Sequence, residues 1–415
     1  MTRQPGVRGT AVLSAVVAVL VAGSLGSCVR FGAASASDCS EDGRIEMPAG
    51  RDSPGSPPAG QPAPVPVPEA LWVADGSGTL SAVDGRTNQV TARVGIGRSI
   101  GPPILAVGGG LVWAYQNDGR IDLVDPVRAR VTASAVVVPA RPLADNRLYH
   151  GHGSLWIAQP GRLWRVSPAG KISAIPLPAD FKPTMLAATG HWLWLAGGRR
   201  LVRVDPTTGA TSIVDDLPGD TGIGQLLGTR DSLLAVGWNQ PEIWVLDPDT
   251  AAPRSSIPLS DSELVSGMYD VGGEVWATGN CGNVVRVGEV AEPQLHKVRV
   301  SDVSQDFPAA VAAGSFWVAD QVRSEVVRID LRTTEVLARL PVEAADPDDP
   351  AFAVVAGRHS VWLLDGDVAG TRILRVDPET NRVLRLPSSV GASPADASFG
   401  VSVVVAAPPT AIARE

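Results

Sequence analysis

The chain has 415 residues, of which 44 are glycine and 35 proline, and its formal net charge is −8 at pH 7. So much glycine and proline, set among segments rich in Val, Ala and Leu, predicts many short strands separated by turns. The acidic charge and the absence of any Lys/Arg block in the sequence argue against nucleic-acid binding, which needs a concentrated basic surface.

The N-terminus has the pattern of an export signal. Arg3 and Arg8 precede an apolar stretch at 11–25, which is too short for a membrane span and is typical of a secretory signal peptide. The letters LGSC, ending at Cys28, resemble the lipobox of bacterial lipoproteins. This resemblance implies that residues 1–27 are removed, that Cys28 is lipidated, and that its acyl chains hold the protein on the cell membrane. The alternative is cleavage after Ala36, which would release a secreted protein.

A proline-rich segment follows the lipobox. Residues 47–69 read MPAGRDSPGSPPAGQPAPVPVPE, and proline denies a packed strand its backbone donors. We expect residues 28–70 to form an extended tether, with a rise of about 3.1 Å per residue in polyproline II geometry.

The three cysteines of the chain occur in no CxxC pair and in no zinc-type spacing with histidine. If Cys28 carries lipid, Cys39 and Cys281 remain. In an oxidising compartment these two would form a disulfide that joins the N-terminal segment to the folded domain. Two free thiols are the alternative.

A tryptophan recurs along the rest of the chain at intervals of 38–45 residues, with Leu234 in its place in one unit. Such regularity predicts a repeat architecture in which the flat indole packs between neighbouring units. The series comprises Trp72, Trp113, Trp156, Trp194, Trp276, Trp317 and Trp362.

An aspartate closes the third strand of most units, and Ser167 and Gly288 replace it in two of them. An aspartate at such a point accepts backbone N–H bonds across a tight turn, so we assign it a structural role rather than a catalytic one. The six aspartates are Asp84, Asp125, Asp205, Asp247, Asp330 and Asp377.

Each full unit contains four apolar runs, which predicts an all-β propeller of four-stranded antiparallel blades over residues 71–415. Dividing the repeat region by a period of about 41 residues gives about eight blades, with seven as the alternative. The first unit lacks an innermost strand, and we expect strand material at 398–407 to complete it and close the ring.

The pattern WVAD…VDxxTxxV resembles the YVTN-type repeat of bacterial surface and periplasmic propellers, from Leu71 onward. This resemblance implies the propeller fold and an extracytoplasmic location. It implies little about activity, because related propellers serve as adhesion modules, receptors, lyases and quinoprotein scaffolds.

The turn between the second and third strands of a blade and the linker to the next blade share one face of a propeller, around its channel mouth. Several carboxylates are predicted there, which could hold calcium through oxygen ligands or attract a cationic ligand. A solvated acidic rim is the alternative, and no cofactor is otherwise predicted. These candidate ligand or metal residues are Asp346, Asp348, Asp349, Asp365, Asp367 and Asp320.

No nucleophile with an evident base is found, since GxSxG and Walker patterns are absent from the sequence. His152, His191 and His359 precede the tryptophan strand at equivalent turns, on the face opposite the channel mouth. The sequence therefore favours a membrane-anchored, extracytoplasmic binding module for a protein, a glycan or a small ligand. The alternatives are a channel-mouth enzyme of the propeller lyase or hydrolase type, and a structural partner in a cell-envelope complex.

Overall fold

The structure is a computed structural model that describes residues 69–74, 77–97, 103–137, 147–215, 217–259, 263–303, 307–343, 352–357, 360–367, 370–386 and 402–406. The predicted signal peptide and nearly all of the predicted tether lie outside these residues. No helix in the described part of the chain is long and apolar enough to cross a membrane.

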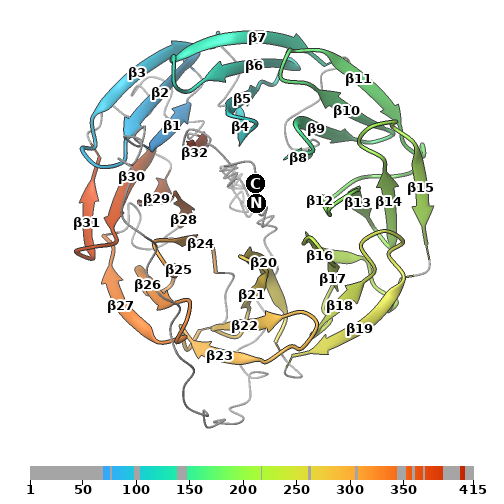
Figure 1. Ribbon diagram of the computed structural model, residues 1–415. Coiled ribbons are helices and arrows are strands. Elements are labelled where there is room, and N and C mark those ends of the chain that lie inside the picture. The colour runs from blue at the N-terminus through green and yellow to red at the C-terminus, as the bar shows by residue number, and fades with distance from the viewer. Residues whose placement is uncertain are drawn as a thin grey trace, which may run out of the picture.

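The described residues form 32 strands, arranged as eight four-stranded sheets in a ring around a common centre (Figure 1). The first blade consists of β1 (Ala70–Ala74), β2 (Thr79–Asp84), β3 (Val90–Gly95) and β32 (Ser402–Ala406). The next three blades consist of β4 (Ile104–Gly108), β5 (Leu111–Tyr115), β6 (Arg120–Asp125) and β7 (Arg130–Val136); β8 (Arg147–Gly151), β9 (Ser154–Gln159), β10 (Arg162–Val166) and β11 (Ile172–Pro176); and β12 (Met185–Ala188), β13 (Leu193–Gly197), β14 (Arg200–Val204) and β15 (Thr211–Val214).

The remaining four blades follow the same order, from the innermost strand to the outermost (Figure 1). Blades 5 and 6 consist of β16 (Ile223–Gly228), β17 (Leu233–Gly237), β18 (Glu242–Leu246) and β19 (Pro253–Pro258); and β20 (Val265–Val271), β21 (Glu274–Gly279), β22 (Asn283–Glu289) and β23 (His296–Arg299). Blades 7 and 8 consist of β24 (Ala309–Ala312), β25 (Ser315–Asp320), β26 (Glu325–Asp330) and β27 (Val336–Pro341); and β28 (Phe352–Ala356), β29 (Val361–Asp367), β30 (Gly370–Asp377) and β31 (Arg382–Arg385).

The C-terminal strand closes the ring. β32 pairs antiparallel with β1, in a register that joins Ala70 to Ala406 and Ala74 to Ser402. The prediction of eight blades, and of a C-terminal strand that completes the first one, is therefore confirmed, and the seven-blade alternative is excluded. The pairing also removes a sheet edge that could otherwise bind another strand.

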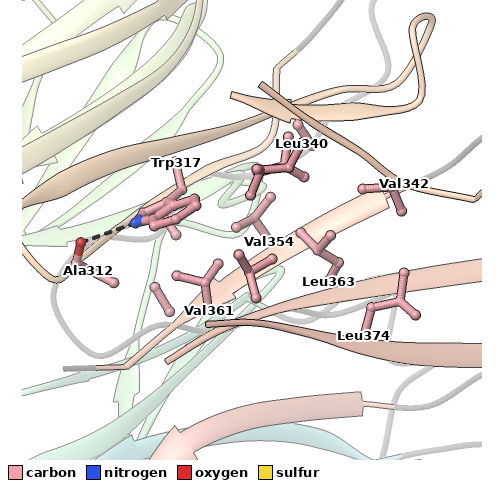
Figure 2. Close-up of a cluster of buried hydrophobic side chains, with 13 residues drawn as sticks. Ala312, Trp317, Leu340, Val342, Val354, Val361, Leu363 and Leu374 are labelled. Atoms are coloured by element: carbon pink, nitrogen blue, oxygen red, sulfur yellow. Dashed lines mark hydrogen bonds between the residues drawn. The ribbon is translucent and has the colours of Figure 1, made fainter. Parts of the chain in front are cut away.

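The tryptophan series forms the core between blades, as predicted. All seven of these tryptophans, and Leu234 in the gap, are at most 1% exposed. Figure 2 shows one such layer, in which Trp317 of blade 7 packs with Val354 and Leu363 of blade 8 and donates its Nε1–H to the Ala312 carbonyl at 3.1 Å. Loss of one such indole would cost about 3–5 kcal/mol.

The aspartates that close the third strands have the structural role assigned to them. Asp205 is representative, because its Oδ1 accepts the backbone N–H groups of Thr207 at 2.7 Å and Thr208 at 3.1 Å. Hydrogen bonds from Thr208 and Thr207 lower the pKa of Asp205, and the pKa of each of the other five is lowered too. These six carboxylates are thus committed to their own turns.

At three blade boundaries, one arginine binds the aspartate turn of the next blade. The sequence did not predict these contacts. Arg165 donates to the Pro206 carbonyl at 2.6 Å, Arg203 to the Asp249 carbonyl, and Arg328 to the Pro378 carbonyl at 2.6 Å. Each arginine also lies beside a tryptophan ring of its own blade. At these three blade boundaries, the aspartate turn is therefore occupied by a contact that holds two blades together.

Candidate functional site at the mouth of the ring

The turns between the second and third strands lie together with the blade-to-blade linkers on one face. Direct backbone hydrogen bonds join them, such as Leu177 N–H to the Gly161 carbonyl at 3.1 Å and Val300 N–H to the Gly282 carbonyl at 2.8 Å. We call this the mouth face; its described turns are 116–119, 160–161, 198–199, 238–241, 280–282 and 321–324. The aspartate turns lie on the opposite face.

The position three residues after the tryptophan position lies at the mouth-face end of the second strand, and the structure describes it in blades 2 to 8. Four blades place a buried polar side chain there, and each of these side chains is at most 1% exposed: Gln116, Gln159, Asp320 and Asp365. Blades 4, 5 and 6 have glycine there instead, at Gly197, Gly237 and Gly279. The ring is therefore asymmetric at this position, with neutral amides in blades 2 and 3, glycines in blades 4 to 6 and carboxylates in blades 7 and 8.

In blade 6 a linker residue occupies the space that the glycine leaves. A Cβ atom on Gly279 would overlap the carboxylate of Glu263, which precedes β20. Glu263 thus stands where blades 7 and 8 place Asp320 and Asp365, so three successive blades bury a carboxylate at equivalent points.

The structure shows Asp320 and Asp365 as buried strand residues beneath the mouth face rather than as a solvated rim, since both are 0% exposed. Asp365 forms an ion pair with Arg372, whose Nε lies 3.1 Å from Oδ2. Asp320 accepts the N–H of Arg323 at 3.1 Å, and the Arg323 guanidinium lies 4.0 Å from its Oδ2. Both carboxylates therefore have a cationic neighbour.

The structure does not describe the side chains of the other four predicted acidic residues. Asp346, Asp348 and Asp349 lie outside the described residues, as does the side chain of Asp367. Among the described residues no three His, Cys, Asp or Glu side chains gather closely enough to hold a metal ion. Calcium binding at these residues stays a prediction.

Cys281 lies on the mouth face, in the turn between β21 and β22. It is 5% exposed and disulfide-bonded, and its carbonyl accepts a hydrogen bond from Arg299 at 2.8 Å. Cys28 and Cys39 lie outside the described residues, so the pairing of Cys39 with Cys281 stays a prediction.

The described turn histidines lie away from the mouth face. His152 has a left-handed backbone conformation, with φ of 49°, and its Nε2 lies 3.4 Å from the Trp192 carbonyl. His191 is exposed beside Asp249, at 3.4 Å. His359 lies outside the described residues.

Blades 5 and 6 differ from the other blades at their innermost strands. The register of β16 against β17 shifts between Ile223 and Gln225, and that of β20 against β21 shifts between Val265 and Gly267. The described innermost strands of the other six blades pair without a shift. Bulges of this kind bend a strand locally and redirect its side chains, often beside functional sites.

The two bulged strands are joined across the blade boundary. The buried Gln225 side chain donates from Nε2 to the Ser266 carbonyl at 2.8 Å, and the Ser266 hydroxyl donates to the Thr278 carbonyl at 3.1 Å. Neutral hydrogen-bonding groups from two blades therefore meet at the inner edge of the mouth face.

Trp238 lies in the turn between β17 and β18, and its side chain is partly buried. Its backbone N–H donates to the Gly222 carbonyl at 2.8 Å, and its indole ring lies over Gly222 and Gly224, where a Cβ would meet ring atoms at 3.0 and 3.5 Å. The sequence analysis missed Trp238 because it does not belong to the tryptophan series. The glycines that precede it in the linker were the only available indication.

Glu263 is distinctive in its charge. It is 1% exposed, its Oε2 accepts the Asn283 amide at 2.6 Å, and its Oε1 has no hydrogen-bond partner. Within the described part of the chain it forms no ion pair. Burial of a carboxyl group without a counter-ion costs free energy whichever protonation state it adopts. Such a cost points to a role beyond packing.

Comparisons with known proteins agree with the fold. No family model matches the chain, and no curated protein matches it in sequence. Among solved structures, the dihydro-heme d1 dehydrogenase NirN is similar at a TM-score of 0.60 and 16% identity, over 81% of this chain and 77% of NirN. Apo AztD from Citrobacter koseri gives 0.55 and 12%, over 83% and 100%. The computationally designed protein Ika8 gives 0.56 and 13%, over 72% and 94%. At these identities the likeness shows the fold alone.

Proposed function

We propose that this protein is a membrane-anchored, extracytoplasmic β-propeller that binds a ligand or a protein partner on its mouth face, at blades 5 and 6. One observation carries the proposal: the departures from the repeat gather there. They comprise the two bulged inner strands, the extra indole of Trp238 and the uncompensated carboxylate of Glu263. The opposite face, by contrast, uses its polar side chains to join blades.

The anchor rests on the sequence. The lipobox-like LGSC supplies Cys28 for lipidation, and the proline-rich tether gives the ring reach from the membrane. The disulfide at Cys281 agrees with an oxidising compartment. Cys28→Ser should move the protein from the membrane fraction to the soluble fraction, and unchanged membrane association would contradict the anchor.

The binding face can be tested with two exposed turn residues. Asn239 lies in the mouth-face turn of blade 5, whereas Thr207 lies in the aspartate turn of blade 4 on the opposite face. A photo-crosslinking amino acid replaces each of them in the full-length protein in intact cells. We expect a specific crosslinked product from position 239 and none from position 207. A product from position 207 alone, or none from either, would overturn the proposed binding face.

A further inference from the structure

Two points connect the propeller to the N-terminal part of the chain, and they lie on opposite faces of the ring. The first is residue 69, where the backbone enters β1. The Glu69 carbonyl accepts the N–H of Gly85 at 3.1 Å, and Ala70 pairs with Asp84, so both partners belong to the aspartate turn of blade 1. The propeller therefore begins on the face opposite the mouth face.

The second point is Cys281, on the mouth face of blade 6. It lies in the turn between β21 and β22, where it is 5% exposed and disulfide-bonded. The chain has 3 cysteines, and the other two, Cys28 and Cys39, both precede residue 69. Whichever of the two is the partner, the N-terminal part of the chain is bonded to the mouth face.

The length of chain from each point to the lipid differs greatly. With Cys28 lipidated, Cys39 is the cysteine left to pair with Cys281, and it follows Cys28 by 11 residues. A chain of that length spans at most about 40 Å when fully extended. Residue 69 follows Cys28 by 41 residues, which span at most about 150 Å. The disulfide therefore replaces a long connection to the opposite face by a short connection to the mouth face.

The short connection restricts how the ring can face the membrane. With the opposite face toward the lipid, the connection would have to pass β22 and β23, which lie outward of Cys281 at a strand spacing of about 4.8 Å, and then descend a blade about 20 Å high. Such a path of about 30 Å is well beyond the root-mean-square span of a flexible 11-residue chain, about 18 Å. With the mouth face toward the lipid, this detour is not needed.

We propose that the disulfide at Cys281 directs the mouth face toward the membrane and holds it within about 40 Å of the lipid surface. The inference rests on the proposed function, since it requires the lipid at Cys28, and it limits the partner of the mouth face to one that is present at the membrane. Residue 69 follows Cys39 by 30 residues, whose extended length of about 100 Å is enough to return from blade 6 to the opposite face of blade 1. The proline-rich tether then gives the ring its full reach only in protein that lacks the disulfide.

Energy transfer to the bilayer tests this orientation. The mature lipoprotein is reconstituted into phosphatidylcholine vesicles that contain an acceptor-labelled lipid, and a donor dye is attached through a non-natural amino acid at position 322 or 332. Val322 lies in the mouth-face turn of blade 7 and Arg332 in the aspartate turn of the same blade, and both are exposed. We expect transfer from position 322 to be at least twofold more efficient than transfer from position 332. Equal transfer, or greater transfer from position 332, would overturn the inference.

Two variants show whether the disulfide sets the orientation. Cys39→Ser removes the bond without changing a residue of the propeller, and Cys281→Ser removes it from the other side. In both variants the longer connection leaves from the opposite face, so the excess transfer from position 322 should disappear, and its persistence in Cys39→Ser would overturn the inference. If the wild-type protein does not bind the vesicles, the proposed lipid anchor fails and the orientation fails with it. If it binds but the two positions transfer equally, only the orientation is refuted.

Discussion

Arg328 offers a direct measure of what holds neighbouring blades together. Its guanidinium donates to Ser315 Oγ at 2.8 Å within blade 7, and to the Pro378 carbonyl at 2.6 Å and Asn381 Oδ1 at 2.9 Å in blade 8. It also lies 5.1 Å from the centre of the Trp317 ring. Arg328→Met keeps most of the stem but removes all three hydrogen bonds and the cation–π contact. For a partly buried charged donor we expect a loss of about 2–4 kcal/mol.

That loss can be read as a change in melting temperature. Unfolding entropy is about 2.1 cal/mol/K per residue, so for a ring of this size 2–4 kcal/mol corresponds to a fall of about 3–6 °C. Arg93→Met is the matched control, because Arg93 is exposed on an outer strand of blade 1. Calorimetry of both variants decides the matter. If Arg328→Met melts no lower than Arg93→Met, the arginine ties do not stabilise the ring.

Three further predictions concern acid stability, ring closure and the disulfide. Partial burial acts to raise the pKa of Asp247, but hydrogen bonds from Thr250, Arg254 and Asp249 outweigh it and lower the pKa to about 2. Its stabilising contribution is therefore complete above the unfolded pKa of about 3.9 and is lost as pH falls through about 2. In urea unfolding, Asp247→Asn should be less stable than the wild type at neutral pH, and the difference should shrink as pH falls from about 4 through about 2, whereas a constant difference would refute this. Deletion of residues 398–415 removes β32 and leaves β1 as an open edge, so size-exclusion chromatography should show self-association, whereas a monomer of unchanged melting temperature would contradict ring closure. Peptide mapping without reduction should recover Cys39 linked to Cys281, and alkylation of both thiols in unreduced protein would refute that pairing.

The fold was predictable because the residues that build it repeat. Trp72 and Trp317, far apart in the chain, occupy the same layer of different blades and are both buried. The turn aspartates are equally regular, since each one accepts the N–H groups that follow it. Even the missing strand of the first blade could be inferred, because an open edge in a ring needs a partner. The regular spacing of these residues was therefore enough to predict the propeller and its number of blades.

The arginine ties were not predicted, although Arg165 and Arg203 each stand one residue before the end of their unit's third strand. Their partners are backbone carbonyls in the next blade, such as that of Pro206. Every residue has a backbone carbonyl, so the amino-acid sequence does not show which carbonyl accepts the hydrogen bond. The contact depends on the angle between adjacent blades, which only the three-dimensional ring provides.

The candidate site was harder to predict for a related reason. The acidic residues chosen from the sequence were grouped by turn and linker, but Asp320 and Asp365 proved to be buried beside arginines. Nothing in the sequence sets Glu263 apart from the other carboxylates of the chain. Its significance depends on Gly279, which vacates the space, and on the lack of a cation beside it among the described residues. Burial and pairing of this kind belong to the folded ring.

Symmetry gives a reason why the departures gather in two adjacent blades. A ring of equivalent blades distributes its stability over all of its interfaces, so a local cost at one boundary is shared by many undisturbed ones. Blades 5 and 6 combine two bulged inner strands with a buried charge, and each of these features weakens a blade by itself. The boundary between blades 5 and 6 also has compensating contacts, since Ile257 of β19 and Val287 of β22 are at most 3% exposed and belong to one buried hydrophobic cluster. Stabilised on its outer side and irregular at its inner edge, this boundary has the arrangement expected of a binding site on a rigid ring.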